Sequence, residues 1–318
     1  MFLNPSKIYQ RMQVLYIFIS IIDYSNCTGQ PKIAICVAGL ASRYQPESIA
    51  KNIIGANEND FDFDIFLSLQ TKNVHFSGHR GLHTQSTIYT DLDHNQIQEI
   101  ATKIYTDNSQ KFNGFVTVST RQIRTVREYA NELGLNELDR ISQGEYWGLR
   151  DKVFSMFENQ EECAKSIIVK EFVTGKKYNF IIMAREDTYL FKPLNMTSVV
   201  SMLGKNCSII TRRCLNWGGL GTRMQVTTRR FGLLLYGSRT TFYKYLADQD
   251  MKVYNTEDLE KKHVEWLHGI PLEISIDLFP VSASRYINQT SVCFVGQEVQ
   301  DNCIPKGYES FVQHNFCS

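Results

Sequence analysis

The sequence predicts an α/β fold in which a mainly parallel, Rossmann-type sheet is flanked by helices, and three observations indicate it. Two compact runs, Lys32 to Gly39 and Tyr178 to Ala184, have the nearly unbroken apolar character of strands that are buried on both faces of a parallel sheet. Segments with the apolar spacing of helices alternate with such runs along the chain. A length of 318 residues, with 43% hydrophobic and 21% charged side chains, suits an ordinary globular protein.

The first half of the chain carries five further predicted elements. Pro46 to Ile54 begins with proline and is predicted as a short helix, and Phe63 to Leu69 as a second strand. Isoleucines at helical spacing predict a helix over Leu92 to Thr106, and Phe115 to Val118 is predicted as a short strand or an irregular segment. Trp147 to Val173 carries an apolar face along its whole length and is predicted as a long helix.

The second half is predicted by shorter runs. Tyr189 to Phe191 is a brief apolar run, and Cys207 to Thr211 is predicted as a strand. Arg229 to Tyr245 is predicted as helical, and Asn255 to Leu267 as a helix that begins with a capping residue. Ile274 to Val281 is predicted as the last strand. With no internal repeat and no linker, residues 31–318 are predicted to form a single domain with a cysteine-bearing C-terminal tail.

The first residues resemble an export signal. Lys7 and Arg11 precede the apolar stretch Val14 to Ile22, which is about half of the roughly 20 residues that a membrane-spanning helix needs. Residues 1–30 are therefore predicted to be a signal peptide or a short signal anchor, which gives a possible membrane tether. The alternative is a first core element of a cytoplasmic protein, which is the expected location if this segment is not a signal.

Glycosylation and cysteine patterns favour export to the secretory pathway, in the lumen of the Golgi or the ER. Four glycosylation tripeptides begin at Asn26, Asn195, Asn206 and Asn288. Cys36 lies in an apolar run and is expected to be a buried free thiol. Three of the eight cysteines crowd the C-terminus, where they could form disulfides in an oxidising lumen: Cys293, Cys303 and Cys317.

Charge and histidine patterns exclude two classes of function. The chain has 34 basic and 33 acidic residues, a balance that does not favour a dedicated nucleic-acid binder. His75, His79 and His83 recur every four residues, but Gly78 and Gly81 interrupt any helix that would align them on a zinc ion. We therefore expect an ordinary loop there and no nucleic-acid partner.

The strongest chemical signal is the tripeptide after the Tyr178 to Ala184 run. Arg185 and Asp187 alternate to one side of an extended segment, and Glu186 to the other. An acid just past a buried strand stands where open α/β sheets bind ligands. A carboxylate beside a guanidinium suits a metal-bridged diphosphate, although a solvated turn with a local ion pair is the structural alternative.

Four segments, in order, resemble glycosyltransferases of the GT-A fold, which act on nucleotide sugars. Tyr178 to Leu194 is similar to their strand that ends in an Arg-x-Asp variant of the Asp-x-Asp signature. Ile33 to Tyr44 looks like the first strand and donor loop, and Asp64 to Leu69 like the second strand. Trp217 to Arg223 resembles the glycine-rich loop on the acceptor side. The resemblance implies a GT-A-like fold and transfer of a sugar to a glycan or another hydroxyl acceptor.

The resemblance also assigns roles to residues of this sequence. Glu257 and Asp258 resemble the acidic pair that supplies the catalytic base, although acids also suit the first turn of a helix. Asp187 would hold a divalent cation, with Mn²⁺ expected, but Arg185 replaces the first acid of the common signature. The implied donor-binding residues are Gly39, Arg43, Arg150, Arg185 and Asp187. The implied acceptor-binding residues are Trp217, Gly218, Gly219 and Arg223.

Two other classes of function stay open from the sequence. A lumenal or secreted binding protein could keep this fold without catalysis, which the replaced first acid permits. Another nucleotide-using α/β enzyme, such as a methyltransferase, is the second alternative. Val37 to Arg43 lacks the GxGxxG spacing that a dinucleotide-binding turn would need.

Overall fold

The computed structural model describes residues 29–70, 93–112, 114–121, 150–204, 207–214, 218–286, 292–294 and 303–315, together with positions 128 and 131. Residues 1–28 of the N-terminal segment predicted as a signal, the three spaced histidines and Trp217 lie outside these residues. Among the described residues, no helix is both long and apolar enough to cross a membrane.

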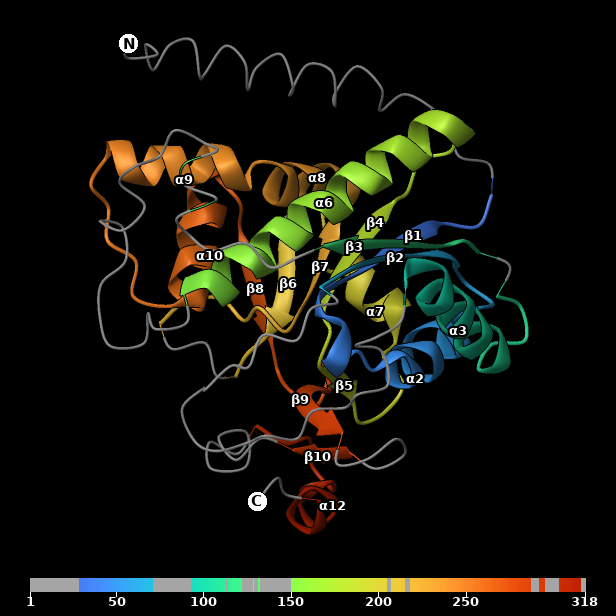
Figure 1. Ribbon diagram of the computed structural model, residues 1–318. Coiled ribbons are helices and arrows are strands. Elements are labelled where there is room, and N and C mark those ends of the chain that lie inside the picture. The colour runs from blue at the N-terminus through green and yellow to red at the C-terminus, as the bar shows by residue number, and fades with distance from the viewer. Residues whose placement is uncertain are drawn as a thin grey trace.

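A seven-stranded sheet forms the centre of the molecule (Figure 1). In spatial order its strands are β3 (Val116–Arg121), β2 (Asp62–Gln70), β1 (Lys32–Leu40), β4 (Phe180–Arg185), β7 (Met224–Thr228), β6 (Ile209–Arg212) and β8 (Pro271–Ile274). The first four strands are mutually parallel, as are β6 and β8, whereas β7 is antiparallel to both its neighbours. The prediction of an α/β fold with a mainly parallel sheet is confirmed.

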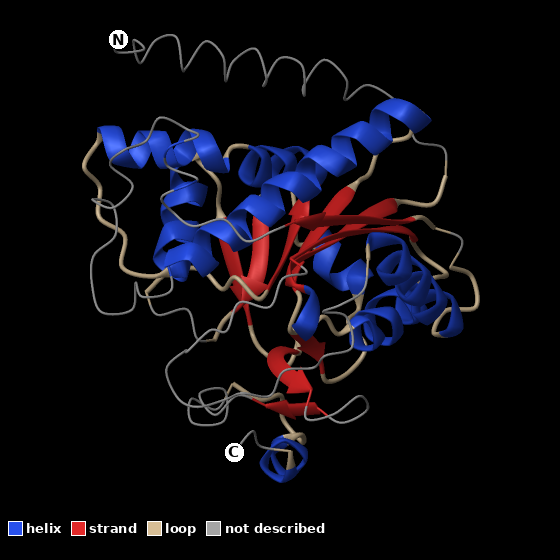
Figure 2. Cartoon of the chain, viewed as in Figure 1, coloured by secondary structure: helices blue, strands red, loops and turns tan. Residues whose placement is uncertain are grey.

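Helices cover both faces of this sheet (Figure 2). One face carries α2 (Pro46–Ile49), which continues as the π-helical η2 (Ala50–Gly55), with α3 (His94–Asp107) and α7 (Met196–Ser201). The other carries α6 (Arg150–Thr174), α8 (Arg229–Gly237), α9 (Arg239–Asp248) and α10 (Thr256–Trp266), with α9 packed on its neighbouring helices. The short 3-10 helix η1 (Ala41–Arg43) follows β1.

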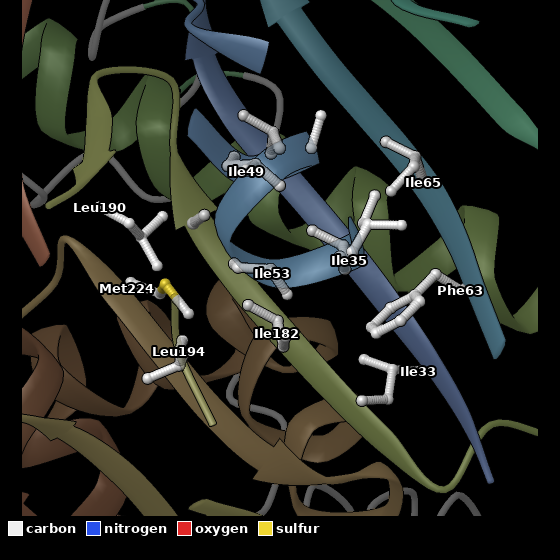
Figure 3. Packing of buried hydrophobic residues seen from close by; sticks show 14 of the residues in the cluster. Ile33, Ile35, Ile49, Ile53, Phe63, Ile65, Ile182, Leu190, Leu194 and Met224 are labelled. Carbon is white, nitrogen blue, oxygen red and sulfur yellow. The ribbon is translucent and has the colours of Figure 1, made fainter. Parts of the chain in front are cut away.

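Alternate residues of β1 supply the two halves of the core. Ile33, Ile35 and Val37 pack into the cluster under α2 and α3, which Figure 3 shows around Ile35 and Ile53. Ala34 and Cys36 face α6 and α8 on the opposite side. Because side chains alternate across a strand, a strand that is apolar on both faces must lie between two layers of helices.

The C-terminal segment forms a small second sheet with a strand from the middle of the chain. It consists of β10 (Val292–Phe294), β9 (Val281–Tyr286) and β5 (Thr188–Leu190). The last described helix, α12 (Glu309–His314), packs Val312 against Phe191 and Phe294. The tail is therefore attached to the segment that directly follows the Arg185–Asp187 turn.

Most predicted elements are present, and two boundaries were wrong. Ile274 to Val281 is not one strand: β8 ends at Ile274 and β9 begins at Val281, with a turn over 275–280. The helical segment predicted over Arg229 to Tyr245 is two helices, because α8 ends at Gly237 and α9 begins at Arg239.

The expectation of a free Cys36 was also wrong. Cys36 forms a disulfide with Cys163, which joins β1 to α6 inside the core. Cys214 is bonded to Cys303, and Cys293 is disulfide-bonded as well. Cys207 is a buried free cysteine. These disulfides fit an oxidising compartment such as the secretory pathway.

Candidate functional site

The carboxyl ends of β1 and β4 bring the predicted donor residues together. The two strands are parallel neighbours, and Ala38 is paired with Arg185 at their ends. Gly39 and Arg43 therefore lie beside the turn of Glu186 and Asp187. This is the edge of the sheet at which open α/β folds bind ligands.

Asp187 is the centre of this site. It has 0% exposed surface, and its carboxylate accepts hydrogen bonds from two arginines. The Nη2 atom of Arg185 lies 3.2 Å from Oδ2, and Nη1 of Arg223 lies 3.0 Å from Oδ2 and 3.2 Å from Oδ1. Arg43 is a third cation, with Nη1 3.9 Å from Oδ2. A buried carboxylate needs such charged partners to remain ionised.

The neighbouring Glu186 fixes the loop after β1. Its Oε1 atom lies 2.6 Å from Nη2 of Arg43, so Arg43 contacts both acids of the turn. Gly39 has φ +146°, and a Cβ atom there would lie 1.9 Å from Oε2 of Glu186. Glycine is therefore required at position 39 by both the backbone conformation and the close approach of Glu186.

The three arginines keep an edge open to solvent although their shared acid is buried. Their side chains are 25% (Arg43), 19% (Arg185) and 20% (Arg223) exposed. The Nε atoms of Arg43 and Arg185 are buried and have no hydrogen-bond partner among the described residues. Burial and the adjacent Arg223 lower the pKa of Arg185. Concentrated guanidinium groups with a wet edge are suited to bind an anion such as a diphosphate.

The glycine-rich loop packs against the start of α10. The Leu220 amide donates to the carbonyl of Glu257 over 2.9 Å. A Cβ atom on Gly219 would lie 2.0 Å from the same carbonyl oxygen, so only glycine allows this contact. Gly218 has φ +83°, in the left-handed region that favours glycine. The loop continues to Arg223, directly before β7, and so connects the predicted acceptor side to Asp187.

The two acids of α10 have different surroundings. The Oε1 atom of Glu257 is 3.5 Å from the Thr222 hydroxyl, and its charge interacts with Arg185 and Arg223. Burial raises the pKa of Glu257, and the two arginines partly oppose this shift. Asp258 instead accepts from the Tyr254 amide and is paired with Lys262. Glu257 therefore faces the arginine cluster, whereas Asp258 stabilises the first turn of its own helix.

Other predicted residues are placed differently or not at all. Arg150 is the first residue of α6, and the structure describes its backbone but not its side chain. Two residues that sequence reasoning left out belong to the cluster: Glu186, which holds Arg43, and Thr222, which reaches Glu257. The alternation of side chains along the strand predicts that Glu186 and Asp187 point to opposite sides. Arg43 nevertheless contacts both acids, because the loop after β1 folds over the turn that carries them.

The side chains around Asp187 do not fit a divalent cation. Both carboxylate oxygens already accept from guanidinium groups, and Glu186 is bound to Arg43. In the described part of the chain, no group of three or more His, Cys, Asp or Glu side chains is placed to hold a metal ion. Mg²⁺ and similar cations are usually held by one or two carboxylates together with substrate phosphates and water, so a cation here would have to draw Asp187 away from its arginines.

This chain is similar to a known protein in structure and not in sequence. No protein-family model matches the chain, and no curated protein sequence matches it. The apo crystal structure of mouse xyloside xylosyltransferase 1 is similar with a TM-score of 0.40 and 10% sequence identity. The similarity covers 78% of this chain and 86% of that protein. At this TM-score the likeness does not establish a shared activity.

Proposed function

We propose that this chain is a glycosyltransferase that moves a sugar from a nucleotide-sugar donor to the hydroxyl group of a glycan or other acceptor. The observation that carries the proposal is the convergence of Arg43, Arg185 and Arg223 on the buried Asp187 at the carboxyl ends of β1 and β4. The Arg185–Asp187 turn, Gly39 and Arg223 belong to three of the segments that resemble GT-A enzymes, and this supports the proposal. The disulfides fit an oxidising compartment such as the secretory pathway.

The proposed reaction uses these groups in two roles. The bond between the sugar C1 and the diphosphate oxygen breaks, and the guanidinium groups stabilise the negative charge that develops on the leaving diphosphate. The acceptor oxygen forms a new bond to C1, and Glu257 takes the proton of its hydroxyl group. In this site the arginines take the place of a metal ion, because their fixed positive charges can neutralise the diphosphate. Asp187 acts as a positioning residue that aligns the three arginines.

A binding protein without catalysis is the second candidate. The observation that favours it is the full engagement of Asp187 with arginines, since the residue that would hold a cation in the related signature is not free to do so. Such a protein would bind a phosphate-bearing ligand at the same arginines but would not turn it over.

Calorimetric titration with UDP, GDP and their sugars tests the proposal, with EDTA or Mn²⁺ present. We expect binding in EDTA, weakened about tenfold or more by Arg223→Gln because one charge-assisted contact is lost. Arg230→Gln is the matched control, since Arg230 is exposed and lies at the start of α8, beyond the opposite end of β7. Absence of nucleotide binding by folded protein would refute the transferase. Binding without transfer or hydrolysis of any bound nucleotide sugar would favour the binding protein.

A further inference from the structure

One glycosylation tripeptide, Asn195-Met196-Thr197, lies wholly within the described residues. Asn195 and Thr197 are exposed, whereas Met196 between them is buried. The middle residue is not proline, so the tripeptide meets the acceptor pattern. The acceptor asparagines of the other tripeptides lie outside the described residues, and these are Asn26, Asn206 and Asn288. Asn195 is therefore the acceptor whose surroundings the structure defines.

The buried side chain of Asn57 turns Asn195 toward solvent. Its Nδ2 atom donates to the Leu194 carbonyl over 2.8 Å, and its Oδ1 atom accepts from the Met196 amide over 2.9 Å. Leu194 and Met196 are both buried, and Figure 3 shows Leu194 in the core. The backbone of Asn195 is extended, and successive side chains of an extended segment point to opposite sides. With both of its neighbours held in the core, the Asn195 side chain faces outward.

The fold uses one of the two polar atoms of the Asn195 amide. The Oδ1 atom accepts from the Ser198 amide over 2.8 Å and so caps α7. No described residue accepts a hydrogen bond from the Nδ2 atom. An N-linked sugar is attached to Nδ2 and leaves the carbonyl oxygen of the amide in place. The helix cap and a glycan on the same side chain are therefore compatible.

We propose that Asn195 carries an N-linked glycan, which is added in the lumen of the secretory pathway. The lone pair of Nδ2 forms a bond to C1 of the first sugar of a lipid-linked oligosaccharide. The bond between C1 and the diphosphate oxygen breaks, the diphosphate leaves on the lipid, and Nδ2 gives up one of its two protons. The proposal rests on export of the chain, which the disulfides support, and not on the proposed transfer activity.

A glycan at this position would leave the candidate site free. The Thr197 hydroxyl donates to Oδ2 of Asp60 over 3.3 Å, just before the start of β2. The arginine cluster lies at the other end of this strand, where Gly39 is paired with Leu69. The strand spans about 23 Å from its start to Leu69. The glycan would therefore cover the amino edge of the sheet, and nucleotide binding should not depend on it.

Mass spectrometry of the full chain, produced in cultured eukaryotic cells, tests the proposal. Peptide N-glycosidase in water labelled with oxygen-18 converts a glycosylated asparagine to a labelled aspartate, and we expect this label at Asn195. Asn195→Asp should remove one glycan and keep the helix cap, because aspartate accepts equally well at this position. Thr197→Val should remove the same glycan with Asn195 intact, and the matched control Thr197→Ser should retain it.

Thermal unfolding separates the loss of a glycan from a failure to fold. Asn195→Asp and Thr197→Val should unfold cooperatively and bind nucleotide as the wild type does. The oxygen-18 label is read without any ligand, so failure of the proposed function would leave this test unaffected. An unlabelled Asn195 in the wild type would overturn the proposal, and so would a number of glycans that Thr197→Val leaves unchanged. Asn195 would then be a helix cap only.

Discussion

At the scale of single residues, Asp187 shows how a buried charge determines the chemistry of its surroundings. A carboxylate without exposed surface must be neutralised, and here arginines from η1, β4 and the segment before β7 do so. Each of these arginines is thereby held in a defined position while a fifth to a quarter of its side chain faces solvent. In this structure Asp187 positions the three arginines and does not act as a metal ligand.

Replacing Asp187 should therefore cost stability as well as binding. Asp187→Ala leaves three cations without their shared acid, and we expect a loss of about 3 kcal/mol in the free energy of unfolding, at the low end for a broken buried pair because the arginines keep some water contact. Urea denaturation measures this loss. Asp187→Asn retains hydrogen-bond acceptance and should lose less. Equal stability of Asp187→Ala and wild type would contradict the role assigned to this carboxylate.

Glu257 should link the pH dependence of activity to that of stability. Since burial raises its pKa, the base is protonated at a higher pH than an ordinary glutamate, and the transfer rate should fall with falling pH through that raised pKa. For the same reason Glu257 favours folding when protonated, and this stabilisation is lost as the pH rises through the raised value. Glu257→Gln should abolish transfer yet raise the melting temperature at pH 7.

Asp258→Asn is the control for this pair of effects. Asp258 is bonded to Lys262 and the Tyr254 amide, so its loss should weaken the start of α10 but leave the acid limb of the rate profile in place. A rate profile that follows Asp258 and ignores Glu257 would reverse the assignment of the base.

At the scale of elements, strand β7 shows what the sequence could not predict. β1 and β4 are apolar on both faces and were predicted correctly, whereas Gln225 and Thr227 make β7 read as polar. Both are buried, because Gln225 bonds the Tyr236 hydroxyl and the Gly221 carbonyl, and Thr227 bonds the Ile181 carbonyl. Tyr236 and Ile181 belong to other elements, α8 and β4, so the pattern of β7 itself does not reveal that its polar groups are satisfied.

In the predicted site, too, some features follow from local sequence signals and others depend on contacts between distant elements. The turn at Asp187 and the start of α10 follow from local signals, namely an acid after an apolar strand and an asparagine before a helix. The contact of Glu186 with Gly39 and the placement of Arg223 on Asp187 depend on which strands become neighbours. Strand order is a property of the whole sheet and is not encoded in any single segment.

A buried ion pair between Arg239 and Glu260 holds helix α10 in place. Because Glu257 lies in the first turn of α10, the pair should fix the position of Glu257 as well as stabilise the fold. Arg239 and Glu260 are 1% and 0% exposed and lie 2.6 Å apart, and Arg239 also bonds Gln160 of α6 and Nδ1 of His263. Arg239→Met and Glu260→Leu should each lower the unfolding free energy by about 3–5 kcal/mol, since each leaves a buried charge unpaired.

The double variant Arg239→Met/Glu260→Leu should regain much of that loss, because no charge stays buried alone. Denaturation of the two single variants and the double variant gives the coupling energy of the pair. Additive losses would show that the two side chains act independently and that the pair does not hold α10 on α6 and α9.

At the scale of the whole molecule, covalent links connect parts that the sequence places far apart. Cys36–Cys163 joins the first strand to the central helix, and Cys214–Cys303 joins the end of β6 to the tail. The crowding of cysteines near the C-terminus predicted a fastened tail, but its partner in the sheet could not be read from spacing. The apolar surroundings of Cys36 suggested a free thiol because an apolar run looks the same whether its cysteine is bonded or not.

The tail disulfide should contribute to the stability of the whole domain. Cys214–Cys303 has a sequence separation of 89 residues, and the chain-entropy relation gives about 4.6 kcal/mol for a loop of this size. Cys214→Ala/Cys303→Ala should therefore lower the melting temperature and make the tail, which packs Phe294 and Val312 on Phe191, sensitive to limited proteolysis. Cys207→Ala is the matched control, since Cys207 is buried but unbonded and its replacement should cost about 1 kcal/mol or less. If the two variants melt alike, the tail is held by its aromatic packing and not by the disulfide.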